Sequence, residues 1–185
     1  MYKKAREVLH QYVENGDVAV TKGGFLTISN DVVPKKDISG LAVLIHSFVP
    51  GEYTNNPWNP YFEQNRDAFV EQFPGTILLG VVDFKERSGL EYTLPWITSI
   101  DHQGPRFIYF TRGMSAHPSK PTKAQFITKI REHFDPESII VGGAEVHEPR
   151  RSTFYFGCAG ATYELLKRHF ATTLDRSLSW MVPRR

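Results

Sequence analysis

The sequence predicts an α/β protein, a layered sandwich in which helices pack on a mixed, mainly parallel central sheet. Two observations predict this class. Apolar β-type runs alternate with helical patterns from residue 41 onward, separated by prolines and glycines. The run over 41–49 is apolar almost throughout, which is typical of a strand buried on both faces and therefore central in a sheet. With 185 residues, the chain fits one domain with a substantial core.

The first 40 residues predict a helix and a hairpin that join this core. Apolar residues at three-four spacing indicate a helix over 3–15. Two short β-type runs, 18–20 and 25–28, flank a Lys-Gly-Gly turn and predict a hairpin. We therefore expect a single domain over 1–185, with an N-terminal helix and hairpin (1–40) and an α/β core (41–185).

Within the core, the pattern predicts strands and helices in alternation. The expected strands are 41–49, 76–84, 107–111 and 139–141, with weaker β-type runs at 90–100 and 153–156. The expected helices are 61–73, 123–134 and 161–170. A long loop is expected at 50–60 and a turn at Gly142-Gly143. A frayed tail is expected after Phe170, containing Trp180 and ending Pro183-Arg184-Arg185.

A second fold remains open. Each half of the core, 41–100 and 106–156, also fits strand–helix–strand–strand. That order would give a ferredoxin-like α+β arrangement, which could be duplicated.

The composition limits the classes of function. Hydrophobic residues make up 41% and charged residues 23% of the chain, as in ordinary globular proteins. The net charge of +2 gives no strong basic field. No apolar segment is long enough for a membrane span, and the basic N-terminus lacks the apolar region of a signal peptide. A single cysteine excludes an internal disulfide, so we expect a cytoplasmic protein.

Cys158 is the strongest catalytic candidate. It is expected at the start of a helix, where the positive end of the helix dipole favours the thiolate. The string from Gly157 to Thr162 resembles the nucleophile elbow of the class I amidotransferase superfamily, and the wider string 139–170 resembles the cysteine site of isochorismatase-type hydrolases. Both resemblances imply a hydrolase-type enzyme. The alternative is a small structural cysteine that packs a tight turn.

Partners for this cysteine are expected at the ends of the strands. His46 and Asp83 lie near the carboxyl ends of two apolar strands, where ligands bind in open α/β sheets. In the hydrolase hypothesis, His46 or His147 is the base, Asp83 orients it, and backbone N–H groups near Ala159-Gly160 hold the oxyanion. A histidine in an apolar strand can equally be a hydrogen-bonded core residue. Asp83-Phe84-Lys85 also resembles the acid-x-Lys element of metal-dependent nucleases.

We expect neither a metal nor a cofactor. The seven histidines show no His-x-His or His-x-x-x-His spacing. Gly142-Gly143 follows a strand and could hold a phosphate, but it lacks the spacing of known phosphate loops.

A second function class is a binder of nucleic acid or nucleotides. Basic residues gather late in the chain, with aromatic residues between them: Arg150, Arg151, Tyr155, Lys167 and Arg168. Such a patch can pair with phosphates and stack on bases, with an affinity that falls as salt rises. The element order over 107–170 also resembles viral replication-initiator and origin-binding domains, and this resemblance implies nucleic-acid binding. The alternative is an ordinary solvated surface.

A third class is a protein-binding accessory or inhibitor module. The loop around Trp58 holds further aromatic residues, Tyr53 and Tyr61, which could meet a partner protein or line a pocket for a small molecule. The sequence leaves the substrate and the oligomeric state open.

Overall fold

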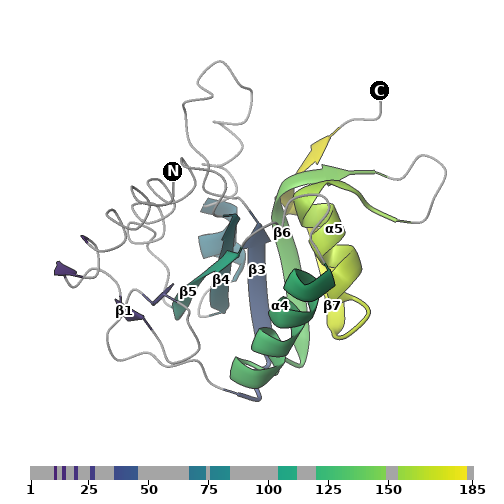
Figure 1. Cartoon of the computed structure of the whole chain (residues 1–185). Coiled ribbons are helices and arrows are strands. Elements are labelled where there is room, and N and C mark those ends of the chain that lie inside the picture. The colour runs from purple at the N-terminus through teal and green to yellow at the C-terminus, as the bar shows by residue number, and fades with distance from the viewer. Residues whose placement is uncertain are drawn as a thin grey trace.

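A computed structural model defines the architecture of the protein (Figure 1). It describes residues 11, 14–15, 19–20, 26–27, 36–45, 67–73, 76–83, 104–111, 120–148 and 154–182. Most of the helix expected over 3–15, the loop over 50–60 and the β-type run over 90–100 lie outside these residues. So do His46, Trp58, Arg150 and Arg151 among the expected site residues.

The described strands form one seven-stranded sheet. They are β1 (Ala19–Val20), β2 (Leu26–Thr27), β3 (Gly40–Ile45), β4 (Ile77–Asp83), β5 (Arg106–Thr111), β6 (Ser138–His147) and β7 (Ala171–Val182). Their order across the sheet is β1-β2-β5-β4-β3-β6-β7. The five strands from β3 to β7 are parallel to one another, and the β1–β2 hairpin adds to β5 in antiparallel orientation. These pairings confirm the α/β class and the hairpin.

The first of the parallel strands in chain order, β3, lies in the middle of the parallel part of the sheet. The chain enters at β3, adds β4 and β5 on one side, and then crosses to β6 and β7 on the other side. β3 is central because its side chains are apolar on both faces, and all five residues of 41–45 are buried. The ferredoxin-like alternative is not confirmed, since it would need antiparallel neighbours where β3, β4 and β5 are parallel.

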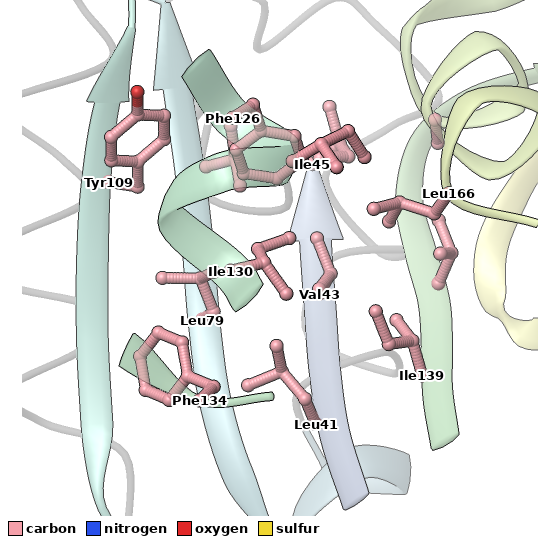
Figure 2. Packing of buried hydrophobic residues seen from close by; sticks show 14 of the residues in the cluster. Leu41, Val43, Ile45, Leu79, Tyr109, Phe126, Ile130, Phe134, Ile139 and Leu166 are labelled. Carbon is pink, nitrogen blue, oxygen red and sulfur yellow. The ribbon is translucent and has the colours of Figure 1, made fainter. Parts of the chain in front are cut away.

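Two helices cover one face of these strands. α4 (Lys120–His133) and α5 (Gly157–Leu166) share a buried apolar cluster with the sheet (Figure 2). On α4, Phe126 stacks on Tyr109 of β5, with 5.4 Å between the ring centroids, and Phe134 just after the helix meets Phe107 edge-on at 5.3 Å. Residues 67–72 are also helical, as expected for the helix over 61–73. None of the described helices has the length and apolar character that crossing a membrane requires.

The fourth strand of the core is longer than predicted, and the expected turn at Gly142-Gly143 is wrong. Both glycines lie inside β6, and Gly143 pairs with Ile45 of β3 and with Ser179 of β7. A Cβ on Gly142 would lie 2.7 Å from the Leu178 Cβ, and one on Gly143 would lie 2.1 Å from the Ile45 carbonyl oxygen. Close backbone approach therefore explains the glycine pair. Because both glycines lie within a strand, they do not form the loop that the phosphate hypothesis requires.

The expectation of a frayed tail is also wrong. Residues 171–182 form β7, a strand of 12 residues that runs parallel to β6. Its register shifts between Val141 and Gly143 of β6, because residues of β7 between Leu174 and Ser179 leave the ladder. These residues form a bulge. Within it, the Asp175 carboxylate accepts hydrogen bonds from the Ser177 N–H at 2.8 Å and from the Ser177 hydroxyl at 2.6 Å.

The last helix begins earlier than predicted. α5 covers 157–166 instead of 161–170, and the residues after it turn directly into β7. The β-type run at 153–156 is not a strand in its described part, because only Phe156 makes a bridge, to His147. Glycines at 157 and 160 have low helix propensity, but tertiary packing of this segment on the core outweighs that preference.

His133, at the end of α4, predicts a weak pH dependence of stability. Burial, followed by the positive charge of Lys129, lowers the pKa of His133; Glu132 opposes this and Lys36 adds to it. The unfolded state then binds more protons at mildly acidic pH, so stability falls as the pH falls through about 6.5. Urea unfolding of His133→Gln should show a smaller loss of stability between about pH 7.5 and about pH 5.5 than the wild type. Equal losses in both proteins would assign the pH dependence to other groups.

Candidate functional site

The candidate site lies where the chain leaves β6 and enters α5. Beyond its pairing with β3, β6 continues to His147, beside β7. The chain then reverses, and Phe156 returns against His147: the His147 N–H donates to the Phe156 carbonyl at 2.9 Å, and the Phe156 N–H donates back at 3.1 Å. This pair of hydrogen bonds anchors Phe156, the last of the three residues that precede α5, Phe154–Phe156, which we call the aromatic segment.

The aromatic segment presents two phenylalanine rings to solvent. Phe154 is 45% exposed and Phe156 is 54% exposed, and among the described residues they are the large hydrophobic side chains with such exposure. Tyr155 lies between them and is half-buried. Its ring meets Tyr163 of α5 edge-on, with the centroids 5.6 Å apart. The segment therefore packs through Tyr155 and exposes the residues on either side.

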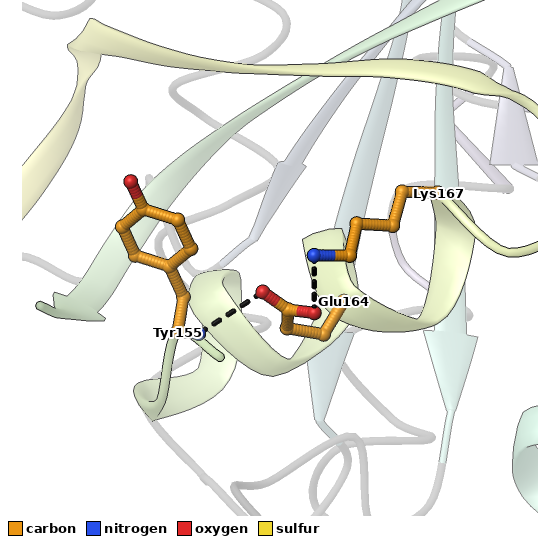
Figure 3. Close-up of polar contacts among 3 residues, drawn as sticks. All are labelled: Tyr155, Glu164 and Lys167. Carbon is orange, nitrogen blue, oxygen red and sulfur yellow. Dashed lines mark hydrogen bonds and ion pairs between the residues drawn. The ribbon is translucent and has the colours of Figure 1, made fainter. Parts of the chain in front are cut away.

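A glycine and a buried carboxylate hold this segment on α5. A Cβ on Gly160 would lie 3.1 Å from the Tyr155 Cβ and 3.2 Å from its carbonyl carbon, so a glycine allows the close approach. One turn further along, the Glu164 Oε1 accepts the Tyr155 N–H at 3.0 Å (Figure 3). Glu164 is only 6% exposed, so the hydrogen bond satisfies a carboxylate that is largely removed from water.

Lys167 forms an ion pair with the Glu164 carboxylate. Its Nζ lies 2.6 Å from Glu164 Oε2, an oxygen that is buried and makes no hydrogen bond of good geometry, so the ion pair compensates its charge (Figure 3). The same ammonium lies 5.0 Å from the ring centroid of Tyr163 and 5.7 Å from that of Phe154. These are cation–π distances. Arg168 follows in the turn after α5 and is exposed.

Cys158 is the second residue of α5 and is half-buried. Its side chain packs against the apolar core, and its carbonyl oxygen accepts the Thr162 hydroxyl at 2.8 Å. The positive φ at this junction, 82°, belongs to Gly157. Cys158 therefore lies at the helix start that the sequence predicts, in contact with the core.

The structure brings some of the expected site residues together. His147 pairs with Phe156, which lies two residues before Cys158 in the chain, and Tyr155 and Lys167 both contact Glu164. The backbone of Asp83 ends β4 opposite Thr111 of β5. The relation of His46, Trp58, Arg150 and Arg151 to these residues lies outside the described ranges. Within the described ranges, no group of three or more His, Cys, Asp or Glu side chains is arranged to hold a metal ion.

Sequence reasoning missed Glu164, Phe154 and Phe156. Glu164 had a readable signal: it is the one charged residue in the apolar helix 157–166, four residues after Gly160 and three before Lys167. The exposure of Phe154 and Phe156 had no signal, since apolar residues at alternate positions usually indicate burial on one face of a strand.

Comparison with known proteins gives no relative for this chain. No family model matches it, and no curated protein and no solved structure matches it. Function therefore has to be inferred from the side chains at the site.

Proposed function

We propose that the protein binds single-stranded nucleic acid through the aromatic segment and the basic residues near it. The observation that carries the proposal is the exposure of Phe154 and Phe156 in a basic setting, with the Lys167 ammonium 5.7 Å from the Phe154 ring centroid and the exposed Arg168 next in the chain. Bases of any sequence stack on exposed aromatic rings, and neighbouring cations attract the phosphate backbone. The proposal keeps Tyr155 and Lys167 as site residues and adds the two phenylalanines.

The energetics support a ligand for these rings. Full burial of a phenylalanine side chain is worth about 1.5–3 kcal/mol, so a partner that covers the exposed half of each ring can recover part of that stabilisation. A protein partner would also cover such rings. The positive charge of Arg168, with Arg150 and Arg151 close before Phe154 in the sequence, favours a polyanion instead.

We also propose that the fold is a layered sandwich and that the protein is cytoplasmic. Ala42, Leu44, Leu78 and Ile108 alternate with the residues that face α4 and α5, and all four are fully buried. This burial supports a layered sandwich with cover on both faces of the sheet. The single cysteine is compatible with a reducing, cytoplasmic compartment.

The direct test is a titration of the protein into a fluorescein-labelled oligothymidylate, followed by fluorescence anisotropy. We expect saturable binding of the single strand and much weaker binding of a duplex, because paired bases are not available for stacking. Added salt should weaken the binding. Absence of single-strand binding at low salt, or equal affinity for the duplex, would exclude the proposed function.

A second candidate function is thiol chemistry at Cys158. Its specific support is the bridge between His147 and Phe156, which holds the His147 backbone beside the residue that precedes α5, where the helix dipole favours an anion. Because Cys158 packs against the apolar core, thiol chemistry ranks behind nucleic-acid binding.

This second function predicts that Cys158 reacts with iodoacetamide in the native protein, with a pH midpoint well below about 8.5, the ordinary cysteine pKa. Mass spectrometry across a pH series measures the midpoint, and His147→Ala should raise it. Labelling that begins only when urea unfolds the protein would instead show a packed structural cysteine, in line with the contact between Cys158 and the core.

A further inference from the structure

Glu164 has no part in base stacking, yet it makes the two polar contacts that organise the surface. Its Oε1 accepts the Tyr155 N–H at 3.0 Å, and its Oε2 pairs with the Lys167 ammonium at 2.6 Å. Burying a carboxylate is costly unless its charge and its lone pairs are compensated. The core-facing side of α5 would accept an apolar residue at this position without that cost, so the carboxylate calls for a functional explanation.

The contacts of Glu164 have opposite consequences for the bases and for the phosphates of a nucleic-acid ligand. The bond to Tyr155 fixes the backbone between Phe154 and Phe156, which presents both rings in a set position. The ion pair holds the Lys167 ammonium between a carboxylate and two rings. A phosphate that approaches Lys167 must then compete with a carboxylate already in contact. The two rings are therefore accessible to bases, whereas the positive charge of Lys167 is already paired and less available to phosphates.

We propose that Glu164 determines the specificity of this surface: it positions the aromatic segment and occupies Lys167, so that the ligand is recognised by its unpaired bases more than by its backbone charge. The ligand class is a flexible single strand with accessible bases. This inference rests on the proposed function and deepens it. It assigns Glu164 a positioning role, since the carboxylate itself does not contact the ligand.

Glu164→Gln and Glu164→Ala separate the two contacts. In Glu164→Gln, the one amide oxygen should stay on the Tyr155 N–H, which is held beside α5, while Lys167 can turn to solvent. Hydrogen exchange should therefore leave the Tyr155 amide protected in Glu164→Gln and expose it about tenfold more in Glu164→Ala. Oligothymidylate affinity at low salt should rise in Glu164→Gln. The slope of log affinity against log salt should become steeper by about 0.7, the value for one added phosphate contact to a single strand.

The double variant Glu164→Gln/Lys167→Met is the control, because it should return the salt slope to that of the wild type. A purely structural role of Glu164 would not give this reversal. An unchanged slope in Glu164→Gln, or a steeper slope that persists in the double variant, overturns the inference. If the wild type binds no oligothymidylate, the proposed function and the ligand assignment both fail, whereas the Tyr155 exchange rates still decide whether Glu164 holds the segment. Glu164→Gln keeps the test valid even if Glu164→Ala does not fold.

Discussion

Gly143→Ala is expected to leave the protein unable to fold stably. Gly143 has φ +110°, a conformation that residues with a Cβ rarely adopt, and the added Cβ would lie 2.1 Å from the Ile45 carbonyl oxygen and 2.6 Å from the Ile45 nitrogen. The backbone conformation alone costs of order 1–3 kcal/mol. The overlap is with the backbone of the central strand, so relief requires β6 to separate from β3. We expect a total loss above about 3 kcal/mol, out of the 5–15 kcal/mol typical of a domain.

Gly40→Ala is the matched control for this prediction. Gly40 begins β3, and the nearest atom to a Cβ there is the Ser138 Oγ at 3.8 Å, an ordinary contact. Chemical denaturation followed by circular dichroism measures both variants. Gly40→Ala should unfold within about 1 kcal/mol of the wild type, and Gly143→Ala should lack a cooperative transition or show one at much lower denaturant. Similar midpoints for the two variants would show that β6 and β3 do not approach as closely as the structure indicates.

The double variant Phe154→Ala/Phe156→Ala is expected to lose nearly all affinity for single-stranded nucleic acid. Stacking of one base on an aromatic side chain is worth about 1–3 kcal/mol, so loss of both rings should weaken binding by roughly two orders of magnitude or more. Both side chains are about half exposed, so stability should change little. Anisotropy with labelled oligothymidylate measures the affinity, and urea unfolding verifies the fold.

Two further variants identify what the rings do. Phe154→Leu/Phe156→Leu keeps apolar surface but removes the aromatic faces, so it should bind oligothymidylate almost as poorly as the alanine variant. Thr128→Ala, at an exposed position of α4, should bind like the wild type. If the leucine variant retains full affinity, the rings act as a general apolar surface and a protein partner becomes the better explanation.

The parts of the fold that could be predicted are those with a strong local pattern. The apolar run from Leu41 predicted a central strand because such a run can only be satisfied by burial on both faces. Helix α4 was predicted from the spacing of Phe126, Ile127 and Ile130, and all three are buried. The hairpin was predicted because glycines between two β-type runs favour a tight turn, and the structure pairs Val20 with Leu26.

The parts that were missed depend on contacts between distant segments. Gly142 and Gly143 look like a turn because glycine usually ends a strand, but here they allow β3 and β7 to approach β6 on both sides. The tail looked frayed because it ends Pro183-Arg184-Arg185, but pairing with β6 satisfies the backbone of residues 171–182 and makes them β7. In both cases, the deciding partner lies more than 30 residues away in the sequence.

The candidate site shows the same division. The sequence by itself determined that Tyr155, Lys167 and Cys158 supply a ring, a charge and a thiol, because these are properties of the residue type. Only the tertiary structure decided their roles: Cys158 packs against the core, whereas Tyr155 and Lys167 meet on Glu164. The physical reason is that the Phe154–Phe156 segment folds back along α5, so that Tyr155 hydrogen-bonds the buried Glu164 carboxylate across a spacing in the sequence that gives no sign of contact.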